Sequence, residues 1–279
     1  MYLILKRSVS RLNLPENKKT PLINSVQLRR ELRQHSYEEW ASLSWQDIGV
    51  MHFEECKFAN NFMVDKIHLS SSEWTSILKL NVNYANLRGV PGNNLEKNGS
   101  SLCRRCSKET ETPSHVLGSC PFNSLLITRR HHKIKHIITG LLQKKRFDCY
   151  EEVHAIDSNG LNRFADILVF PNNTKEAYIL DPTIRYENNK TDQALLVDQE
   201  KDIYEACIPF YKEKYAGKYG IRNFTVYGLL FGARGTMYKH TADILKTFGI
   251  EKADLNFLAE SIIADSIGII HHHIYQTSH

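Results

Sequence analysis

The most constraining feature of this chain is a short array of cysteine and histidine residues within residues 101–121. Cys103, Cys106, His115 and Cys120 follow a C-x2-C-x8-H-x4-C spacing. Three thiolates and one imidazole complete the tetrahedral shell of a zinc ion and leave no coordination position open for a substrate. We therefore expect a closed zinc site that folds a loop and performs no chemistry. An incidental grouping of the four residues is the alternative interpretation.

Charge is distributed unevenly along the 279 residues. Residues 1–146 carry 23 Lys and Arg against 12 Asp and Glu, whereas the remainder carries 13 against 19. A basic first half favours a polyanionic partner such as nucleic acid, because phosphate contacts release counterions, and an acidic second half suits divalent cations. A solvated basic surface is the alternative interpretation of the first half.

The composition is that of a globular protein, with 42% hydrophobic and 24% charged residues. Cys56, Cys149 and Cys207 are scattered and suggest no disulfide framework, so a reducing compartment is expected. The apolar run at the start is too short for a signal peptide, and no stretch approaches the length of a membrane span. We therefore expect no membrane partner.

Hydrophobic periodicity divides the chain into a helical first part and a mixed second part. Helices are predicted over residues 25–37, 72–80, 123–145, 192–215, 237–248 and 253–271. Ser72 is a candidate cap for the second of these, and Pro209 a candidate kink in the fourth. Strands are predicted over residues 150–156, 163–170, 177–185 and 224–231, with a tight turn at 157–160. This order favours a mixed α/β (α+β) sheet flanked by helices.

The helix over residues 123–145 is strongly basic. Arg129, Arg130, Lys133, Lys135 and His136 surround its apolar stripe. One interpretation lays this helix along a phosphate backbone, and the other makes it a half-buried helix with ordinary solvated charges. The neighbouring His131 and His132 are expected to contact phosphate or solvent. The run of histidines at 271–273 resembles a metal tract, and a solvated helix end is the favoured interpretation.

Two aspartates lie within hydrophobic strand runs. Asp166 and Asp181 are costly there as ions unless they are paired or bind a cation. On neighbouring strands they would converge on one Mg²⁺, which prefers oxygen ligands and would activate a water molecule against a phosphodiester. Two frayed strand ends that face water are the alternative interpretation.

Further residues are candidates for the same centre. Lys201, on the helix after the third strand, is the candidate for orienting the attacking water. A third carboxylate would come from Glu152, with Glu151 as the alternative, whereas Asp157 is expected to belong to the turn. Glu187 is expected either to assist the metal or to pair with Arg185.

Several of these segments together resemble a known family. Cys103-Arg-Arg-Cys106 and His115-Val-Leu-Gly-x-Cys120 resemble the zinc knuckle in the C-terminal part of site-specific non-LTR retrotransposon polyproteins that carry a restriction-enzyme-like endonuclease. Other matching segments are Ile127–Ile134, Arg163-Phe-Ala-Asp166, Ile179-Leu-Asp181-Pro-Thr-Ile-Arg-Tyr-Glu187, Glu200-Lys201-Asp-Ile-Tyr204 and Phe231-Gly-Ala-Arg-Gly235. The resemblance covers roughly residues 24–260.

The resemblance implies a PD-(D/E)XK nuclease fold in which the lysine has moved to a helix. Thr183 stands where the common pattern has lysine, which agrees with Lys201, and Tyr204 belongs to the same helical motif. Ala165 departs from the proline of the family. The implied domains are a basic, mostly helical linker region (1–98), a CCHC zinc knuckle (99–122) and the endonuclease domain (123–279).

The implied activity is a Mg²⁺-dependent endonuclease that nicks target double-stranded DNA in the nucleus to prime reverse transcription. Structural Zn²⁺ would hold the knuckle, and the implied partners are the DNA, the element RNA and the reverse transcriptase portion of the same polyprotein. The candidate nucleic-acid contacts are Arg104, Arg105, Arg129, Arg130, His131 and Lys133. No Tyr/Phe-x-Asp-Asp polymerase motif occurs, so we expect the C-terminal part of a longer RNA-directed DNA polymerase polyprotein. The alternatives are a catalytically inactive nucleic-acid-binding remnant and a zinc-stabilised interaction module.

Overall fold

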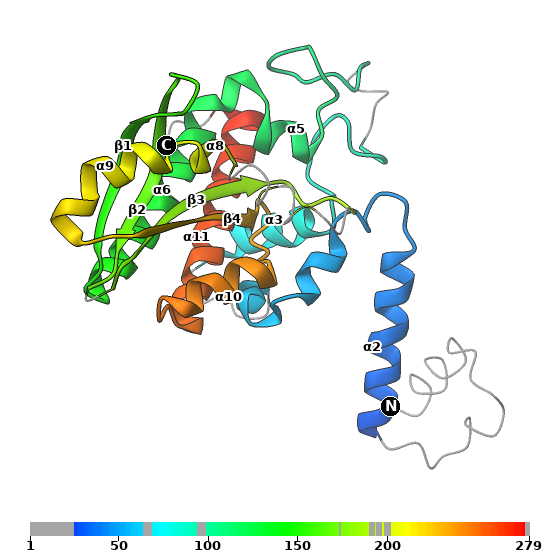
Figure 1. Ribbon diagram of the computed structural model, residues 1–279. Coiled ribbons are helices and arrows are strands. Elements are labelled where there is room, and N and C mark those ends of the chain that lie inside the picture. Colours follow the sequence, from blue (N-terminus) through cyan, green and yellow to red (C-terminus); the bar gives the residue numbers. More distant parts are fainter. Residues whose placement is uncertain are drawn as a thin grey trace. The chain divides into compact units, whose positions relative to one another are not determined.

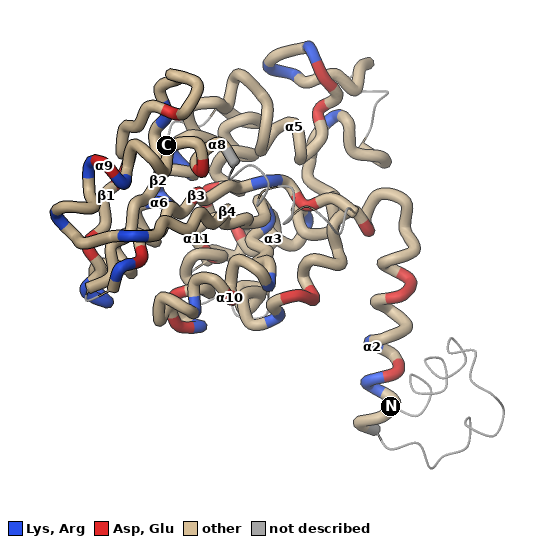
Figure 2. Tube along the Cα trace, viewed as in Figure 1, with Lys and Arg blue, Asp and Glu red and all other residues tan. Residues whose placement is uncertain are grey.

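The computed structural model describes residues 25–63, 69–93, 99–172, 174–189, 193, 197 and 202–276. The chain divides into two compact units, residues 1–47 and residues 48–279, and each is described by itself. In the first unit, helix α2 spans Ser25–Ala41. Basic and acidic residues are interspersed along it (Figure 2), and Gln27 and Gln34 each donate a hydrogen bond to a glutamate four residues later. These exposed pairs add modest stability to the helix.

The second unit is built on a four-stranded mixed sheet in the order β1-β2-β3-β4 (Figure 1). The strands are β1 (Asp148–Ile156), β2 (Asn162–Phe170), β3 (Glu176–Arg185) and β4 (Asn223–Gly232). The first three strands pair antiparallel, whereas β3 and β4 pair in parallel. A parallel pair requires a crossover connection, and this one carries α8 (Asp202–Glu205) and α9 (Ile208–Tyr219).

The turn between β1 and β2 is the one predicted at residues 157–160. The Asp157 carboxylate accepts hydrogen bonds from the backbone N–H groups of Asn159 and Leu161, and Gly160 adopts a left-handed φ of +80°. Arg163 pairs with the same carboxylate at 3.1 Å. Asp157 thus belongs to the turn, as the sequence predicted.

Helices cover both faces of the sheet (Figure 1). On one face Leu168, Phe170 and Ile179 join Tyr211 of α9 in a buried cluster. The opposite face carries Tyr178, whose ring meets Phe248 at the end of α10 with centroids 5.0 Å apart. The helices on this side are α6 (Ser124–Lys144), α10 (Lys239–Thr247) and α11 (Lys252–Tyr275). The predicted mixed sheet flanked by helices is therefore confirmed.

Helix α11 is the long internal helix of this unit. This helix has 24 residues, and buried side chains occur along it from Leu255 to His273, as in a helix surrounded by protein. It contacts α6 on the sheet side and four shorter helices on the other. These are η3 (Lys57–Met63), α3 (Ser71–Asn81), α5 (Pro113–Gly118) and η4 (Pro121–Asn123), while η2 (Val50–Glu54) precedes them. Helix α11 thus joins the sheet to the segments that precede α6.

Two predicted helix features require correction. Helix α3 is capped by Ser70 rather than Ser72, because the reciprocal capping box needs Glu73 three residues after the cap. The predicted helix over residues 192–215 is interrupted in its described part, since α8 ends at Glu205 and α9 begins at Ile208. Pro209 lies in the first turn of α9, where its missing N–H costs no helical hydrogen bond.

The Gly-Ala-Arg-Gly segment after β4 forms a buried ion pair. The Arg234 guanidinium lies 3.2 Å from the Glu187 carboxylate, and both side chains are completely buried. Gly232 leaves room for that carboxylate, which a Cβ atom would displace, and Gly235 has a left-handed φ of +84°. Glu187 therefore pairs with Arg234 and not with Arg185, and it does not assist a metal.

No helix in the described ranges has both the length and the apolar character needed to cross a membrane.

Candidate functional site

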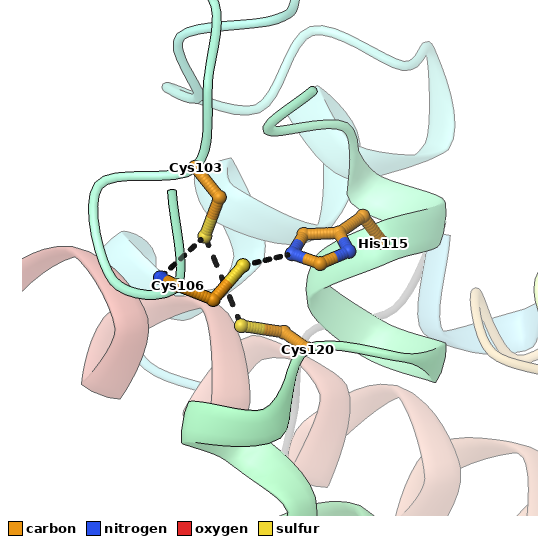
Figure 3. A group of neighbouring side chains, drawn as sticks. All are labelled: Cys103, Cys106, His115 and Cys120. Atoms are coloured by element: carbon orange, nitrogen blue, oxygen red, sulfur yellow. Dashed lines mark hydrogen bonds between the residues drawn. The ribbon is translucent and has the colours of Figure 1, made fainter. Parts of the chain in front are cut away.

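The four predicted zinc ligands converge on one point (Figure 3). The Sγ atoms of Cys103 and Cys120 are 3.8 Å apart, and Cys106 Sγ is 3.3 Å from His115 Nε2. Two thiolates about 2.3 Å from one tetrahedral ion stand about 3.8 Å apart, so the spacing fits zinc. All four ligand atoms lie within 4.8 Å of one another.

Local structure brings His115 into this shell. Helix α5 begins with Pro113 at its first position, and the Thr112 hydroxyl caps it by accepting a hydrogen bond from His115 N. His115 Nδ1 is 3.0 Å from a Glu109 carboxylate oxygen and 3.2 Å from Ser119 Oγ. These partners leave Nε2 directed at the thiolates, which is how outer carboxylates orient metal-binding histidines.

The environment of the cysteines favours thiolate at one position. Burial raises the pKa of the Cys106 thiol, but backbone N–H groups of Lys108 and Glu109 and contacts with Cys103 and His115 outweigh it and lower the pKa to about 7. Burial raises the pKa of Cys120 to about 12. A bound cation would remove that difference, because coordinating thiols are deprotonated.

A second buried cluster joins the segment that carries Cys103 to the end of α11. His273 Nε2 lies 3.1 Å from Glu111 Oε1 and 3.6 Å from Cys103 Sγ, and both His273 and Glu111 are wholly buried. Glu111 also accepts a two-pronged hydrogen bond from Arg104, and these partners hold its pKa well below the usual range despite burial. Arg105 donates to the His273 and Ile274 carbonyls at the end of α11.

This cluster corrects one prediction. The histidine run was expected to be a solvated helix end, but His273 is part of the packed interior. Arg104 and Arg105, the candidate nucleic-acid contacts, are partly exposed and pair with groups of the same chain. In each case the partner is more than five residues away in the sequence, so local pattern does not reveal it.

Strand register brings Asp166 and Asp181 together. The ladder between β2 and β3 ends at the pair Ile167 and Leu180, and the two aspartates are the next residue on each strand. Their carboxyl groups interact directly, and this interaction helps to lower the pKa of Asp166. Beyond this point β3 is paired only with β4, where Gly228 stands opposite Asp181. The two carboxyl groups therefore lie next to each other at the point where β2 and β3 separate.

Asp166 is a buried carboxylate with several partners. Burial raises its pKa, but hydrogen bonds with His131 and Asp181 and the charges of His131 and Lys135 outweigh burial, so the pKa is lowered. His131 Nε2 lies 3.4 and 3.3 Å from the two Asp166 oxygens. In turn, the Asp166 hydrogen bond raises the pKa of His131.

Helix α6 supplies a lysine that the sequence analysis did not assign to this centre. The Lys135 ammonium contacts Glu152 and lies 3.7 Å from Asp166 Oδ1, and its side chain is wholly buried. Lys135 and His131 are four residues apart and so share one helix face. That spacing was the available signal, but without the placement of α6 against the strands both residues read as surface charges.

Glu152 lies opposite Asp166 in the register of β1 and β2, yet the pairing is interrupted there. Its backbone has a left-handed φ of +50°, which is strained for a residue with a side chain. The Glu151 carboxylate instead lies 2.5 Å from His136 Nδ1 of α6. Glu152 and Asp166 thus share a contact with Lys135, whereas Glu151 pairs with His136.

Of the two residues predicted from the helical Lys/Tyr motif, only Tyr204 lies within the described part of the chain. Lys201 lies outside the described residues, so its place stays a prediction. Tyr204 of α8 is half-buried, and burial followed by the charges of Asp181 and Asp166 raises its pKa. Its hydroxyl therefore stays protonated at neutral pH.

The remaining basic residues of α6 face different surroundings. Arg130 is buried and donates to Ser266 Oγ and the Leu117 carbonyl oxygen, each at 2.8 Å, so it is unavailable to phosphate. Lys133 is exposed and pairs with Asp265 at 2.9 Å, and Arg129 is exposed. The helix is thus half-buried, with only part of its charge on the surface.

The carboxylate pair fits a hard divalent cation. Two carboxylates in contact cannot both ionise without a shared proton or a positive charge between them. Oxygen ligands of this kind suit Mg²⁺, which keeps several waters and needs only one or two carboxylates from the protein.

No protein-family model matches the chain. The chain is 26% identical over 209 residues to the retrovirus-related Pol polyprotein from the type-1 retrotransposable element R2 of Popillia japonica. The match covers 75% of this chain and 41% of the relative, so the chain spans less than half of that polyprotein. Together with the four-ligand cluster, the match shows that the chain is a distant homologue of an R2 non-LTR retrotransposon Pol polyprotein.

Proposed function

We propose that this chain is the metal-dependent DNA endonuclease part of a non-LTR retrotransposon polyprotein. It would nick target double-stranded DNA and leave a 3′ hydroxyl that primes reverse transcription by a polymerase domain absent from this chain. The observation that carries the proposal is the contact between Asp166 and Asp181 at the point where β2 and β3 separate. The relationship to a retrotransposon polyprotein supports it.

Asp166 and Asp181 would hold the Mg²⁺, with Glu152 as a third carboxylate beside them. When bound, the ion would polarise the scissile phosphate and lower the pKa of an attacking water. His131 fixes the orientation of the Asp166 carboxylate through their contact. Lys201 is the proposed group that orients the water, as its motif implies.

Tyr204 has a proposed role that follows from its protonation. Because its pKa is raised by burial and by the two aspartates, the phenol is a hydrogen-bond donor at neutral pH and not a base. A donor beside two metal-binding carboxylates suits an anionic phosphate oxygen.

Zinc would complete the four-ligand site and stabilise the loop without contacting substrate. Nucleic-acid contacts are proposed for the exposed Arg129 and Lys133 and for His131 beside the carboxylates. Arg104, Arg105 and Arg130 are left out because their partners are internal. The proposed partners are the target DNA, the element RNA and the reverse transcriptase portion of the polyprotein, and the proposed location is the nucleus.

The alternative is a folded remnant that binds nucleic acid and does not cut it. Ala165, in place of the proline of the family, is the observation that favours it. Ala165 is buried within β2, opposite Val153, whose carbonyl oxygen accepts a hydrogen bond from the Tyr211 hydroxyl at 2.8 Å. The alanine keeps a backbone N–H that proline would lack.

A plasmid-nicking assay separates the two functions. Supercoiled DNA incubated with the zinc-loaded chain and Mg²⁺ should be converted to the open-circular form. Asp181→Asn should abolish nicking and leave DNA binding intact, with Asp157→Asn, which alters only the hairpin turn, as the matched acidic control. Salt-sensitive DNA binding without nicking by the wild-type chain would support the remnant.

A further inference from the structure

Lys135 is the only buried lysine among the described residues. An ammonium group removed from water is costly unless charge and hydrogen bonds compensate it. Here two carboxylates from neighbouring strands compensate the charge. The amine contacts Glu152 of β1 and lies 3.7 Å from Asp166 Oδ1 of β2. The amine thus occupies the position that a cation would occupy between these carboxylates.

The fold holds this arrangement in place. Helix α6 lies against β1, β2 and β3, and Ile134, Ile138 and Leu142 beside Lys135 are buried. On β1, the left-handed backbone of Glu152 interrupts the pairing opposite Asp166. Strained residues of this kind persist where the surrounding structure requires them. His132 Nδ1 also lies 3.7 Å from the Glu152 carboxylate, so the acidic cluster is bordered by positive or neutral groups of α6.

We propose that Lys135 is a resident cation of the carboxylate cluster in which Glu152 and Asp166 contact its amine and Asp181 contacts Asp166. Its ammonium holds the cluster together when no divalent ion is bound. Because the amine and the ion draw on the same oxygens, the positive charge opposes loading and sets the metal concentration at which the site fills. Lys135 is a positioning residue, since its buried amine acts through Glu152 and Asp166. This inference rests on the proposed function only in placing a divalent ion at these carboxylates.

The test is direct binding of Mn²⁺ to the full zinc-loaded chain, followed by the electron paramagnetic resonance signal of the free ion. Lys135→Gln and Lys135→Met should bind Mn²⁺ about tenfold tighter, because a unit charge a few ångströms from a divalent ion is removed. Lys135→Arg keeps the charge and should bind within about twofold of wild type, scaled on the same Coulomb relation.

Two further variants make the result specific. Lys144→Met removes the same charge from the exposed end of α6, away from these carboxylates, and should leave Mn²⁺ affinity unchanged. Asp166→Asn should greatly weaken binding and so locate the ion. Circular dichroism melting confirms that each variant is folded, and Lys135→Gln, which retains a hydrogen bond donor, provides the test if Lys135→Met does not fold.

The outcomes separate this inference from the proposed function. Unchanged or weaker Mn²⁺ binding by folded Lys135→Gln would overturn the resident-cation role even if the chain nicks DNA. Tighter binding in a chain that never nicks DNA would support the role and count against the endonuclease. Mn²⁺ binding that does not depend on Asp166 would overturn both.

Discussion

The buried pair of Arg234 and Glu187 allows a quantitative test of what the Gly-Ala-Arg-Gly segment does. Besides its contact with Glu187, the Arg234 guanidinium donates to the Asn81 carbonyl at 3.0 Å and to the Ile48 carbonyl at 2.7 Å. Replacement by methionine keeps most of the side-chain volume. It leaves the Glu187 carboxylate buried without a counter-ion and two carbonyl oxygens without a donor.

The expected cost follows from these losses. Removing one partner of a buried ion pair costs about 3–5 kcal/mol. Glu187 keeps hydrogen bonds from the backbone N–H of residue 234 and from the Thr236 hydroxyl, which favours the lower end. With the two orphaned carbonyls, we expect Arg234→Met to lower the free energy of unfolding by about 4 kcal/mol. Adding Glu187→Gln removes the stranded charge and should restore about 1.5 kcal/mol or more.

Urea unfolding at fixed zinc concentration, followed by far-UV circular dichroism, measures both values. Arg222→Met is the matched control, because Arg222 is an exposed arginine before β4, and it should cost less than about 1 kcal/mol. The reasoning is refuted if Arg234→Met costs less than about 1 kcal/mol, or if the two single changes are simply additive in the double variant.

Three further predictions concern the candidate sites. Chelation of zinc should expose residues 101–121 to protease, since structural zinc contributes on the order of 10 kcal/mol to such loops, and unchanged protection would refute the zinc assignment. His131→Asn should destabilise the chain most near pH 6 in urea unfolding without added divalent metal. The folded pKa of His131 is raised, so its contribution is present below the unfolded value and is lost as pH rises through the folded value. A cost that grows toward pH 9 would be inconsistent with the Asp166 contact. Arg129→Gln should weaken DNA binding and reduce the slope of log K against log salt by about 0.9, and an unchanged slope would exclude a phosphate contact there.

Sequence pattern predicted the parts of the site that depend on local spacing. The spacing of the cysteines and the histidine predicted the four candidate zinc ligands. Alternating hydrophobic residues and turn residues predicted the strands. The two strands that carry Asp166 and Asp181 were predicted in this way, and their register makes the two positions neighbours. These features need only short-range geometry.

The parts that could not be predicted depend on how helices pack. Lys135 and Arg130 have the same chemistry as the exposed Lys133 and Arg129, and only the placement of α6 against β1 and α11 decides which of them are buried. His273 meets Cys103 across 170 positions of sequence, which no local pattern encodes. Lys201 lies outside the described residues, so its contribution to the catalytic centre remains a prediction.

The buried cluster of Cys103, Glu111 and His273 has a practical consequence for the preparation of shorter versions of this protein. An excised peptide spanning only the cysteine array would lack the imidazole and the carbonyl groups on which Arg105 rests. A deletion that includes residues 273 and 274 would remove the same imidazole and carbonyl groups. A shorter version that keeps the four candidate ligands together with these packing partners would therefore be discontinuous in sequence, and deletion boundaries chosen from the ligand spacing alone would separate them.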